Sequence, residues 1–115
     1  MSEFLYLYHE DESPRAPEHM QEQLQKWAIW MKGLGEKGHL KDPGQPLEKT
    51  GKFVKGKGAS RTVTDGPFAE TKDVIGGYTI IEAKDIAQAV ELSTGCPILE
   101  NGGTVEVRPV IKMEM

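Results

Sequence analysis

The segment "TDGPFAETKD", residues 64–73, contains groups that could carry out acid-base chemistry. Asp65 is followed by Gly66, Pro67 and Phe68. Proline fixes its own φ at about −65° and pushes the preceding residue toward extended conformations. We therefore expect a stiff turn that presents the Asp65 carboxylate at the mouth of a pocket, where it can take up or release a proton. The alternative is structural: Asp65 accepts backbone N–H groups of the turn, and Phe68 fills the core.

Two adjacent glycines, Gly76 and Gly77, lie inside the strand that we expect just after this turn, "DVIGGYTIIEA". Glycine inside a strand indicates a bulge, or a place where another group approaches the backbone closely. A rigid acid beside a glycine-lined gap is typical of a small-molecule pocket. The sequence favours such a pocket and indicates no cofactor.

His19 is a second candidate for acid-base chemistry. It falls in the first turn of a predicted helix, whose positive end favours the neutral imidazole that can act as a general base. The competing interpretation is an ordinary surface histidine. We take Asp65 and His19 as the candidate catalytic pair, with Tyr6 of the first strand bordering the space between them.

Three other features have structural interpretations that we prefer. "GKFVKGKG" matches part of a phosphate-binding loop, but Gly follows Lys57 where Ser or Thr is needed, and extended chain follows, so we reject nucleotide binding. "HEDE", residues 9–12, places its polar groups side by side in a loop, which is a poor metal site. Cys96 is the single cysteine, so no internal disulfide forms, and we expect a structural role for it.

Hydrophobic patterning predicts two helices and several strands. In the first helix, which opens at Pro17, the expected inner face has apolar residues spaced by three and four. Asp85 is the expected cap of the second helix, with Gln88 completing a capping box. The inner faces are Met20, Leu24, Trp27, Met31 and Leu34 in the first helix, and Ile86, Ala89, Val90 and Ser93 in the second.

The strands are expected at residues 3–8, in a hairpin or meander between 44 and 64 with its turn near "KGKGA", across the glycine pair, and at "TVEVRPVIKMEM". In that last strand we expect Val105, Val107, Ile111 and Met113 to face one way, with Pro109 confining the strand to an edge or a bulge.

This order predicts an α+β fold of the ferredoxin-like β-α-β-β-α-β type, a single domain over residues 1–115, with both helices on one face of an antiparallel sheet. The other face is left uncovered. We expect Phe4, Tyr6 and Tyr8 to belong to it and to pair with a second subunit or close over a ligand.

Composition and charge limit the kinds of partner that this protein is expected to bind. Against 18 Asp and Glu there are 14 Lys and Arg, giving a formal charge of −4, which is the opposite of a general nucleic-acid binder. No apolar run approaches the length of about 20 residues that spans a bilayer, and no export signal is evident at the N-terminus. We expect a cytoplasmic protein that contacts neither nucleic acid nor membrane.

The stretch "VTDGPFAETKDVIGGYTIIEAKDIAQAVELSTGCP", followed by "GGTVEVRPV", resembles the DGPF domain of the YCII-related family of small bacterial proteins. The resemblance covers residues 63–110 and implies a ferredoxin-like domain that forms a dimeric α+β barrel. YCII members are proposed to hold a His and Asp pair in a pocket; the His would fall near His19, and Asp65 comes from the DGPF motif. Some DGPF members are linked to extracytoplasmic-function sigma factors.

The DGPF pattern also includes Glu70, Lys72, Glu106 and Arg108, which we interpret as a buried structural ion-pair network. Two functional hypotheses follow. The first is a homodimer with a small-molecule pocket and acid-base chemistry. The second is a regulatory module that binds a protein partner, such as a sigma factor, through its acidic surface and the apolar Ile29 and Trp30 of the first helix.

Overall fold

The computed structural model describes residues 1–10, 17–66 and 74–113. Two short 3-10 turns, η1 (Gly58–Ser60) and η2 (Pro97–Asn101), accompany the main elements. These are β1 (Ser2–Glu10), α1 (Pro17–Glu36), β2 (Leu40–Asp42), β3 (Gly51–Lys55), β4 (Thr62–Gly66), β5 (Val74–Ala83), α2 (Ile86–Ser93) and β6 (Thr104–Pro109).

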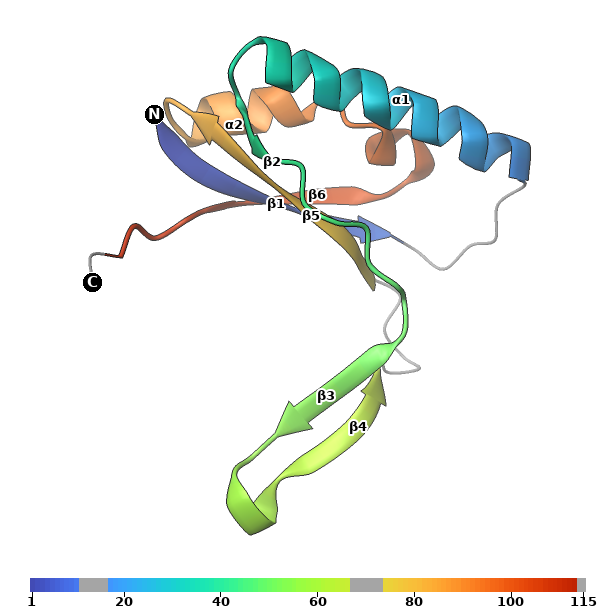
Figure 1. The fold of residues 1–115 in the computed structure, drawn as a ribbon, viewed down its shortest axis with the longest axis vertical. Helices are drawn as coiled ribbons and strands as arrows, with labels where there is room; N and C mark the ends of the chain where they lie inside the picture. Colours follow the sequence, from blue (N-terminus) through green and yellow to red (C-terminus); the bar gives the residue numbers. More distant parts are fainter. Residues whose placement is uncertain (11–16, 67–73, 114–115) are drawn as a thin grey trace.

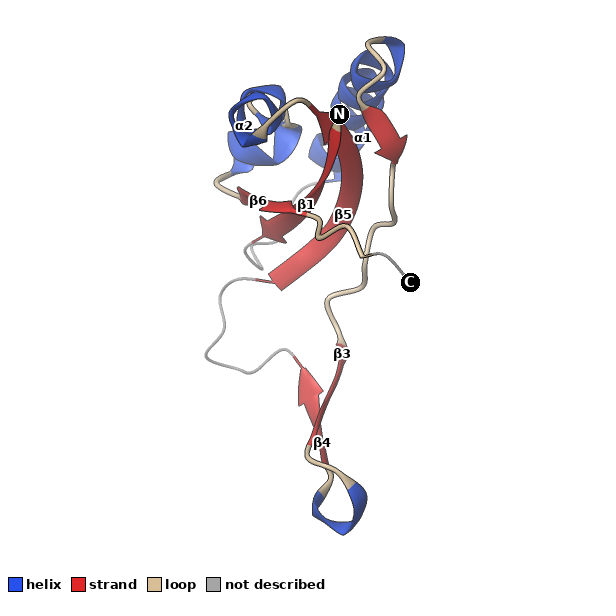
Figure 2. Ribbon diagram, turned by 90° about the vertical axis from the view of Figure 1, so that its left-hand side faces the viewer, coloured by secondary structure: helices blue, strands red, loops and turns tan. Residues whose placement is uncertain are grey.

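Four of the described strands form an antiparallel sheet in the order β2-β5-β1-β6, and β3 and β4 form a separate two-stranded sheet. This is the ferredoxin-like arrangement, in which the first and third strands of the β-α-β-β-α-β unit lie at the centre. Both helices cover the same face of the sheet (Figure 2). The predicted α+β fold is confirmed, and Pro109 ends an edge strand as expected. No helix in the described ranges is long and apolar enough to cross a membrane.

The aromatic residues of β1 face the helices, so the prediction that they lie on the uncovered face is wrong. Phe4, Tyr6 and Tyr8 are all buried in the core between sheet and helices. Tyr6 donates its hydroxyl to the carbonyl of Ala89 in α2, and burial raises the pKa of its phenol. The open face carries the alternate residues of β1 instead, among them the half-buried Leu5.

The inner face of α1 is rotated from the predicted one. Trp27, Met31 and Leu34 point inward as expected, but Met20 and Leu24 are 56% and 69% exposed. Their place toward the sheet is taken by Gln23, which is buried, and Trp30. The two tryptophans carry the largest apolar areas of the helix, and this rotation brings both of them over the sheet.

Trp30 is therefore a core residue and not a surface one. Its ring stacks on Tyr6 with centroids 6.0 Å apart, and its Nε1 donates to the carbonyl of Leu92 at 3.2 Å. Ile29 lies on the outer side of α1 and is 73% exposed, as the periodicity predicts. The apolar surface available to a protein partner is thus smaller than the sequence suggested.

Helix α2 begins as predicted and packs differently. The Asp85 carboxylate accepts from the backbone N–H of Gln88 at 2.8 Å, and the Gln88 side chain accepts from the N–H of Lys84 at 2.8 Å. Ala89 and Ser93 are buried. Ile86 and Val90 were expected on the inner face and are about half exposed, because α2 is short and contacts the sheet through its small residues.

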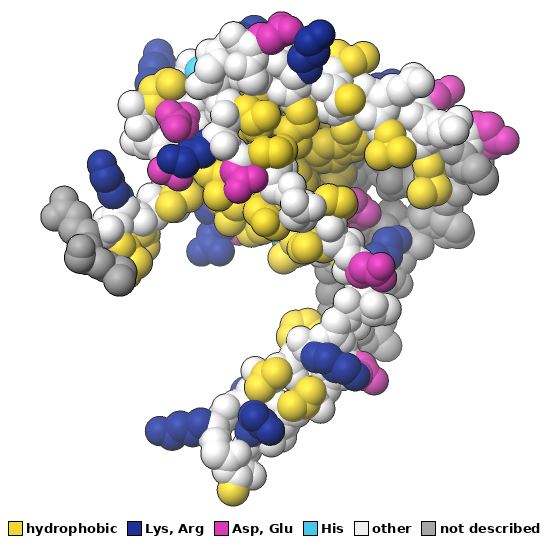
Figure 3. Space-filling view, in the orientation of Figure 1, with side chains coloured by type: hydrophobic (Ala, Val, Ile, Leu, Met, Phe, Trp, Pro, Cys, Tyr) yellow, Lys and Arg dark blue, Asp and Glu magenta, His cyan; other side chains and the backbone are white. Residues whose placement is uncertain are grey.

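Strands β3 and β4 form a hairpin that projects away from the sheet (Figure 1). The expected hairpin is confirmed, with η1 at its tip, and every residue from 51 to 65 is exposed. Lysine, arginine and apolar side chains share its surface (Figure 3). At the C-terminal end, β6 stops at Pro109, so Ile111 and Met113 are exposed and were wrongly expected to continue the buried face.

The glycine pair forms the expected bulge. Tyr8 pairs with Gly77 while His9 pairs with Ile75, which leaves Gly76 as an extra residue on β5. The group that approaches these glycines is another part of the same chain, since Pro46 forms an isolated bridge with Gly77.

Candidate functional site

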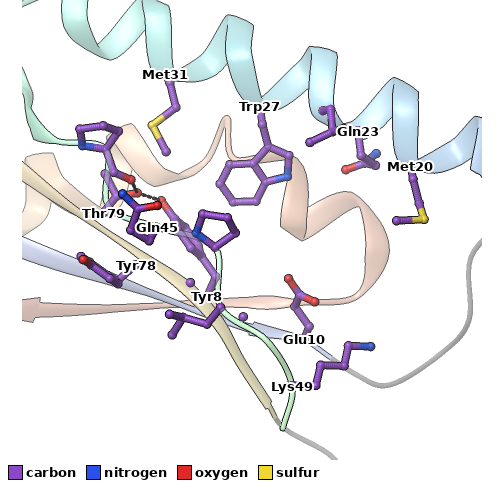
Figure 4. Close-up of a pocket in the computed structure, with 16 residues that line it drawn as sticks. Tyr8, Glu10, Met20, Gln23, Trp27, Met31, Gln45, Lys49, Tyr78 and Thr79 are labelled. Atoms are coloured by element: carbon purple, nitrogen blue, oxygen red, sulfur yellow. Dashed lines mark hydrogen bonds between the residues drawn. The ribbon is translucent and has the colours of Figure 1, made fainter. Parts of the chain in front are cut away.

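A pocket opens because β2 is too short to cover the full length of β5. After Asp42 the chain leaves the ladder, and residues 43–49, here called the crossing segment, bond to β5 again where the Leu47 N–H donates to the Gly76 carbonyl at 2.9 Å. Pro43 and Pro46 lack the N–H groups that would continue a strand. Between this crossing segment and α1 lies a cavity of about 580 Å³, which Figure 4 shows in close-up.

The cavity is lined mainly by apolar groups. Helix α1 forms its roof and residues 43–49 form one wall, while β1 and β5 supply the floor. Met20 and Leu24 line this cavity although both are exposed to solvent. An apolar hollow is seen below α1 (Figure 3). The lining residues from the roof and the wall are Met20, Gln23, Leu24, Trp27, Met31, Pro43, Gln45, Pro46, Leu47 and Lys49.

The floor is fixed by a short hydrogen-bond chain. The Tyr8 hydroxyl donates to Thr79 Oγ1 at 2.7 Å, and Thr79 Oγ1 donates to the Pro43 carbonyl at 3.0 Å. Burial raises the pKa of Tyr8 above its usual value, so the phenol stays protonated and keeps this bond well above neutral pH. These two hydrogen bonds tie the crossing segment to the sheet.

The roof is held by packed aromatic rings. Trp27 meets Tyr8 edge to face, with centroids 4.8 Å apart and planes at 84°. It also meets Trp30 edge to face, at 5.7 Å and 78°. Such contacts add about 0.5–1.5 kcal/mol per pair beyond the burial of area. These two ring contacts hold the Trp27 ring in one orientation beside the cavity.

Two ionisable side chains mark the open end of the cavity, Glu10 at the end of β1 and Lys49 on the crossing segment (Figure 4). A Cβ at Gly76 would collide with the Glu10 carboxylate, so the missing side chain makes room for that group. Within the described residues Glu10 is the carboxylate that lines the cavity. It is placed to exchange a proton with a bound molecule.

Comparison with known proteins identifies the family. A model of the YCII-related domain matches residues 4–114, almost the whole chain. The chain belongs to the YCII-related family. The resemblance seen at residues 63–110 is therefore confirmed, and it extends through the first helix. No curated protein sequence matches this YCII-related chain significantly.

One solved structure with a detectable likeness is that of 5-chloro-2-hydroxyhydroquinone dehydrochlorinase (TftG) from Burkholderia phenoliruptrix AC1100, in complex with 2,5-dihydroxybenzoquinone. The likeness covers 90% of each chain at 14% sequence identity, with a TM-score of 0.42. At that identity and score, nothing about ligands or residues of the YCII-related chain follows from it.

The predicted catalytic pair lies apart from the pocket. Asp65 is at the end of β4 in register with Lys52, which donates to its carboxylate, and its side chain is 85% exposed. The His19 ring nitrogen Nε2 lies 2.8 Å from Asn101 Oδ1 in η2. Neither residue lines the cavity. Their catalytic role in this YCII-related chain stays a prediction.

Other predicted residues divide into four groups. Gly76 and Gly77 line the cavity, whereas Tyr6 is sealed in the core behind it. Gly66 ends β4 opposite Gly51, against the ring of Phe53. The residues that lie outside the described ranges are Pro67, Phe68, Glu70 and Lys72.

The ion-pair network around Glu106 and Arg108 was predicted to be buried, and that part of the prediction is wrong. Their side chains are 42% and 65% exposed on the open sheet face, with Arg108 Nε 3.7 Å from Glu106 Oε2. Glu106 Oε1 also lies 2.9 Å from His9 Nε2. Because β6 is an edge strand and its outward side chains meet no helix, these charges stay in contact with water.

Three parts of the candidate site were not predicted from the sequence: Gln23, Glu10 and the crossing segment. Gln23 and Trp27 are four residues apart, which places both on one face of α1, and this spacing was available in the sequence. The two prolines of "DPGQPL" indicate a turn. Neither signal says where the segment will lie relative to α1.

Proposed function

We propose that this YCII-related protein binds a small, flat, mostly apolar molecule in the cavity below α1. The observation that carries the proposal is the fixed Trp27 ring, held at 84° to Tyr8 beside a cavity of about 580 Å³. Small-molecule sites are typically clefts of about 300–1,000 Å³ with apolar linings and few polar groups. A flat ligand gains contact with the indole without any rearrangement of the pocket.

Acid-base chemistry on the bound molecule falls to Glu10 in this proposal. It is the carboxylate at the open end of the cavity, and the neutral phenol of Tyr8 below it is already committed to Thr79. Asp65 and His19 remain predicted catalytic residues. They do not line this cavity, so they would act only in a different site.

We further propose that two copies pair through the open face of the sheet. The apolar side chains there, including Leu5, Leu7 and Ile80, are half-buried within one chain, and a second sheet would cover them. Replacing Leu7 by Asp should then lower the sedimentation coefficient to that of a monomer. Replacing Ile29 by Asp, on the outer side of α1, should leave it unchanged, and the same response in both variants would contradict the proposal.

The regulatory alternative has less support. Of the two apolar residues that motivated it, Ile29 is exposed and Trp30 is packed against Tyr6 and Leu92. Single exposed apolar residues are common on protein surfaces. The link to a sigma factor stays a prediction from the resemblance.

The ligand-binding proposal is tested with a panel of one-ring and two-ring aromatic fragments and ligand-detected NMR. Members of the panel should bind the wild-type protein and lose binding in Trp27→Leu. The matched control Ile29→Ala, on the other side of the same helix, should bind as the wild type does. The proposal fails when no fragment binds the folded protein, or when Trp27→Leu binds them unchanged.

A further inference from the structure

The roof of the pocket contains a buried polar atom without a partner. Gln23 is 9% exposed, and its Oε1 has no hydrogen-bond partner within the described parts of the chain. The same residue lines the cavity beside Trp27 (Figure 4). Buried side-chain oxygens are nearly always paired, and an exception in a native protein calls for a physical reason.

The neighbouring Glu100 decides which end of the Gln23 amide is unpaired. Lys26, 2.7 Å from Glu100 Oε2, and the nearby Gln23 side chain both lower the pKa of this carboxyl group. An ionised carboxylate can only accept, so the NH₂ group is the end of the Gln23 amide that favours the side of Glu100. The carbonyl oxygen Oε1 is then the end that is left without a donor, and exchanging the two ends of the amide would not satisfy it.

The other polar groups near the cavity do not need a ligand in the same way. Tyr8 and Thr79 bond to each other and to the Pro43 carbonyl. The Gln45 side chain is exposed, so water can satisfy its amide. Gln23 Oε1 is closed to water. Because the last side-chain torsion of glutamine is broad, a modest rotation can turn this oxygen toward a bound molecule.

We propose that the molecule bound in this pocket is a neutral aromatic ring compound bearing an O–H or N–H donor, and that Gln23 Oε1 accepts that hydrogen bond. The inference rests on the proposed function and adds the chemical class of the ligand. Trp27, one turn further along α1, contacts the ring, while Gln23 selects the donor. A site built to pair a donor discriminates strongly against an analogue that lacks it.

The test uses two matched pairs of probes, indole with N-methylindole and phenol with anisole. Each pair keeps the ring and removes the donor. Titration calorimetry on the wild-type protein should show about tenfold tighter binding of the donor in each pair, the effect of one hydrogen bond to a buried acceptor. Gln23→Met should reduce this ratio to about one, because the acceptor is lost at similar side-chain size. Gln25→Met, at an exposed position of the same helix, should keep it.

The outcomes separate the two proposals. Equal binding of both members of a pair to the wild-type protein overturns the donor inference and leaves the pocket. A uniform loss of all four probes in Gln23→Met also overturns it, since Gln23 would then act by shape. Failure of every probe and every fragment to bind removes the proposed function itself. Thermal unfolding checks the variant, and Gln23→Met should be at least as stable as wild type because an unpaired acceptor has been removed.

Discussion

Replacing Gly77 by alanine should destabilise the protein and weaken ligand binding, whereas the same change at Gly76 should not destabilise it. A methyl group at Gly77 would lie 3.0 Å from the Gln45 carbonyl oxygen and 3.4 Å from Pro46 Cα, both in the backbone of the crossing segment. A methyl group at Gly76 would meet only the end of the Glu10 side chain, which can turn aside. The two neighbours therefore form a matched pair.

The expected size follows from two opposing effects. Overpacking against backbone costs about 1–3 kcal/mol, and alanine gains about 0.4–1 kcal/mol by restricting the unfolded chain where φ is not positive, as at both glycines. Gly77→Ala should thus lose about 1–2 kcal/mol of unfolding free energy, and Gly76→Ala should be neutral or slightly stabilised. Urea unfolding measures both values. Equal stability and equal probe affinity in the two variants would refute the account of the pocket wall.

Three further predictions concern single side chains. Tyr8→Phe removes the hydrogen bond to Thr79 and should cost about 1 kcal/mol in urea unfolding, while Tyr78→Phe on the open face should change stability by less than about 0.5 kcal/mol. Burial raises the pKa of Cys96 from 9.0 to about 12. The folded state therefore holds this proton more tightly, so the unfolding free energy should fall as the pH rises from about 8 to about 10, and less so in Cys96→Ala; an equal slope would be contrary evidence. Asp65→Asn should leave probe affinity unchanged, because Asp65 lies on the projecting hairpin; a clear loss would restore it to the site.

Local patterns were sufficient to predict most elements and their order, but they did not predict β2 (Leu40–Asp42). The capping carboxylate of Asp85, the hairpin turn at its glycines and the bulge at Gly76 all depend on a few neighbouring residues. The order of the strands and helices then restricts the fold to a small set, of which the ferredoxin-like arrangement is one. These parts of the structure could be read without knowing any long-range contact.

The orientation of faces could not be predicted in the same way. In β1 both sets of alternating residues are apolar, Phe4, Tyr6 and Tyr8 on one side and Leu5 and Leu7 on the other, so period-two alternation does not say which set meets the helices. In α1 the deciding factor was the placement of two tryptophan rings over the sheet, which turned Gln23 inward.

The pocket depends on contacts between segments that are distant in the sequence. Its wall is residues 43–49, its roof is α1 and its floor joins β1 to β5, and no local motif encodes that meeting. The DGPF motif drew attention to Asp65, whose strand lies on a hairpin away from the sheet (Figure 1). The glycine pair was the predicted feature whose residues line the cavity.

The central claim is that a flat molecule binds against Trp27 below α1. The most direct measurement is the pair of tryptophan side-chain N–H signals in the NMR spectrum of the isotope-labelled wild-type protein, assigned with Trp30→Phe and followed as indole or phenol is added. We predict that the Trp27 signal shifts and saturates while the Trp30 signal, whose N–H is bonded to the Leu92 carbonyl, moves little. Saturating shifts confined to the projecting hairpin, or no shift at Trp27, would contradict the claim.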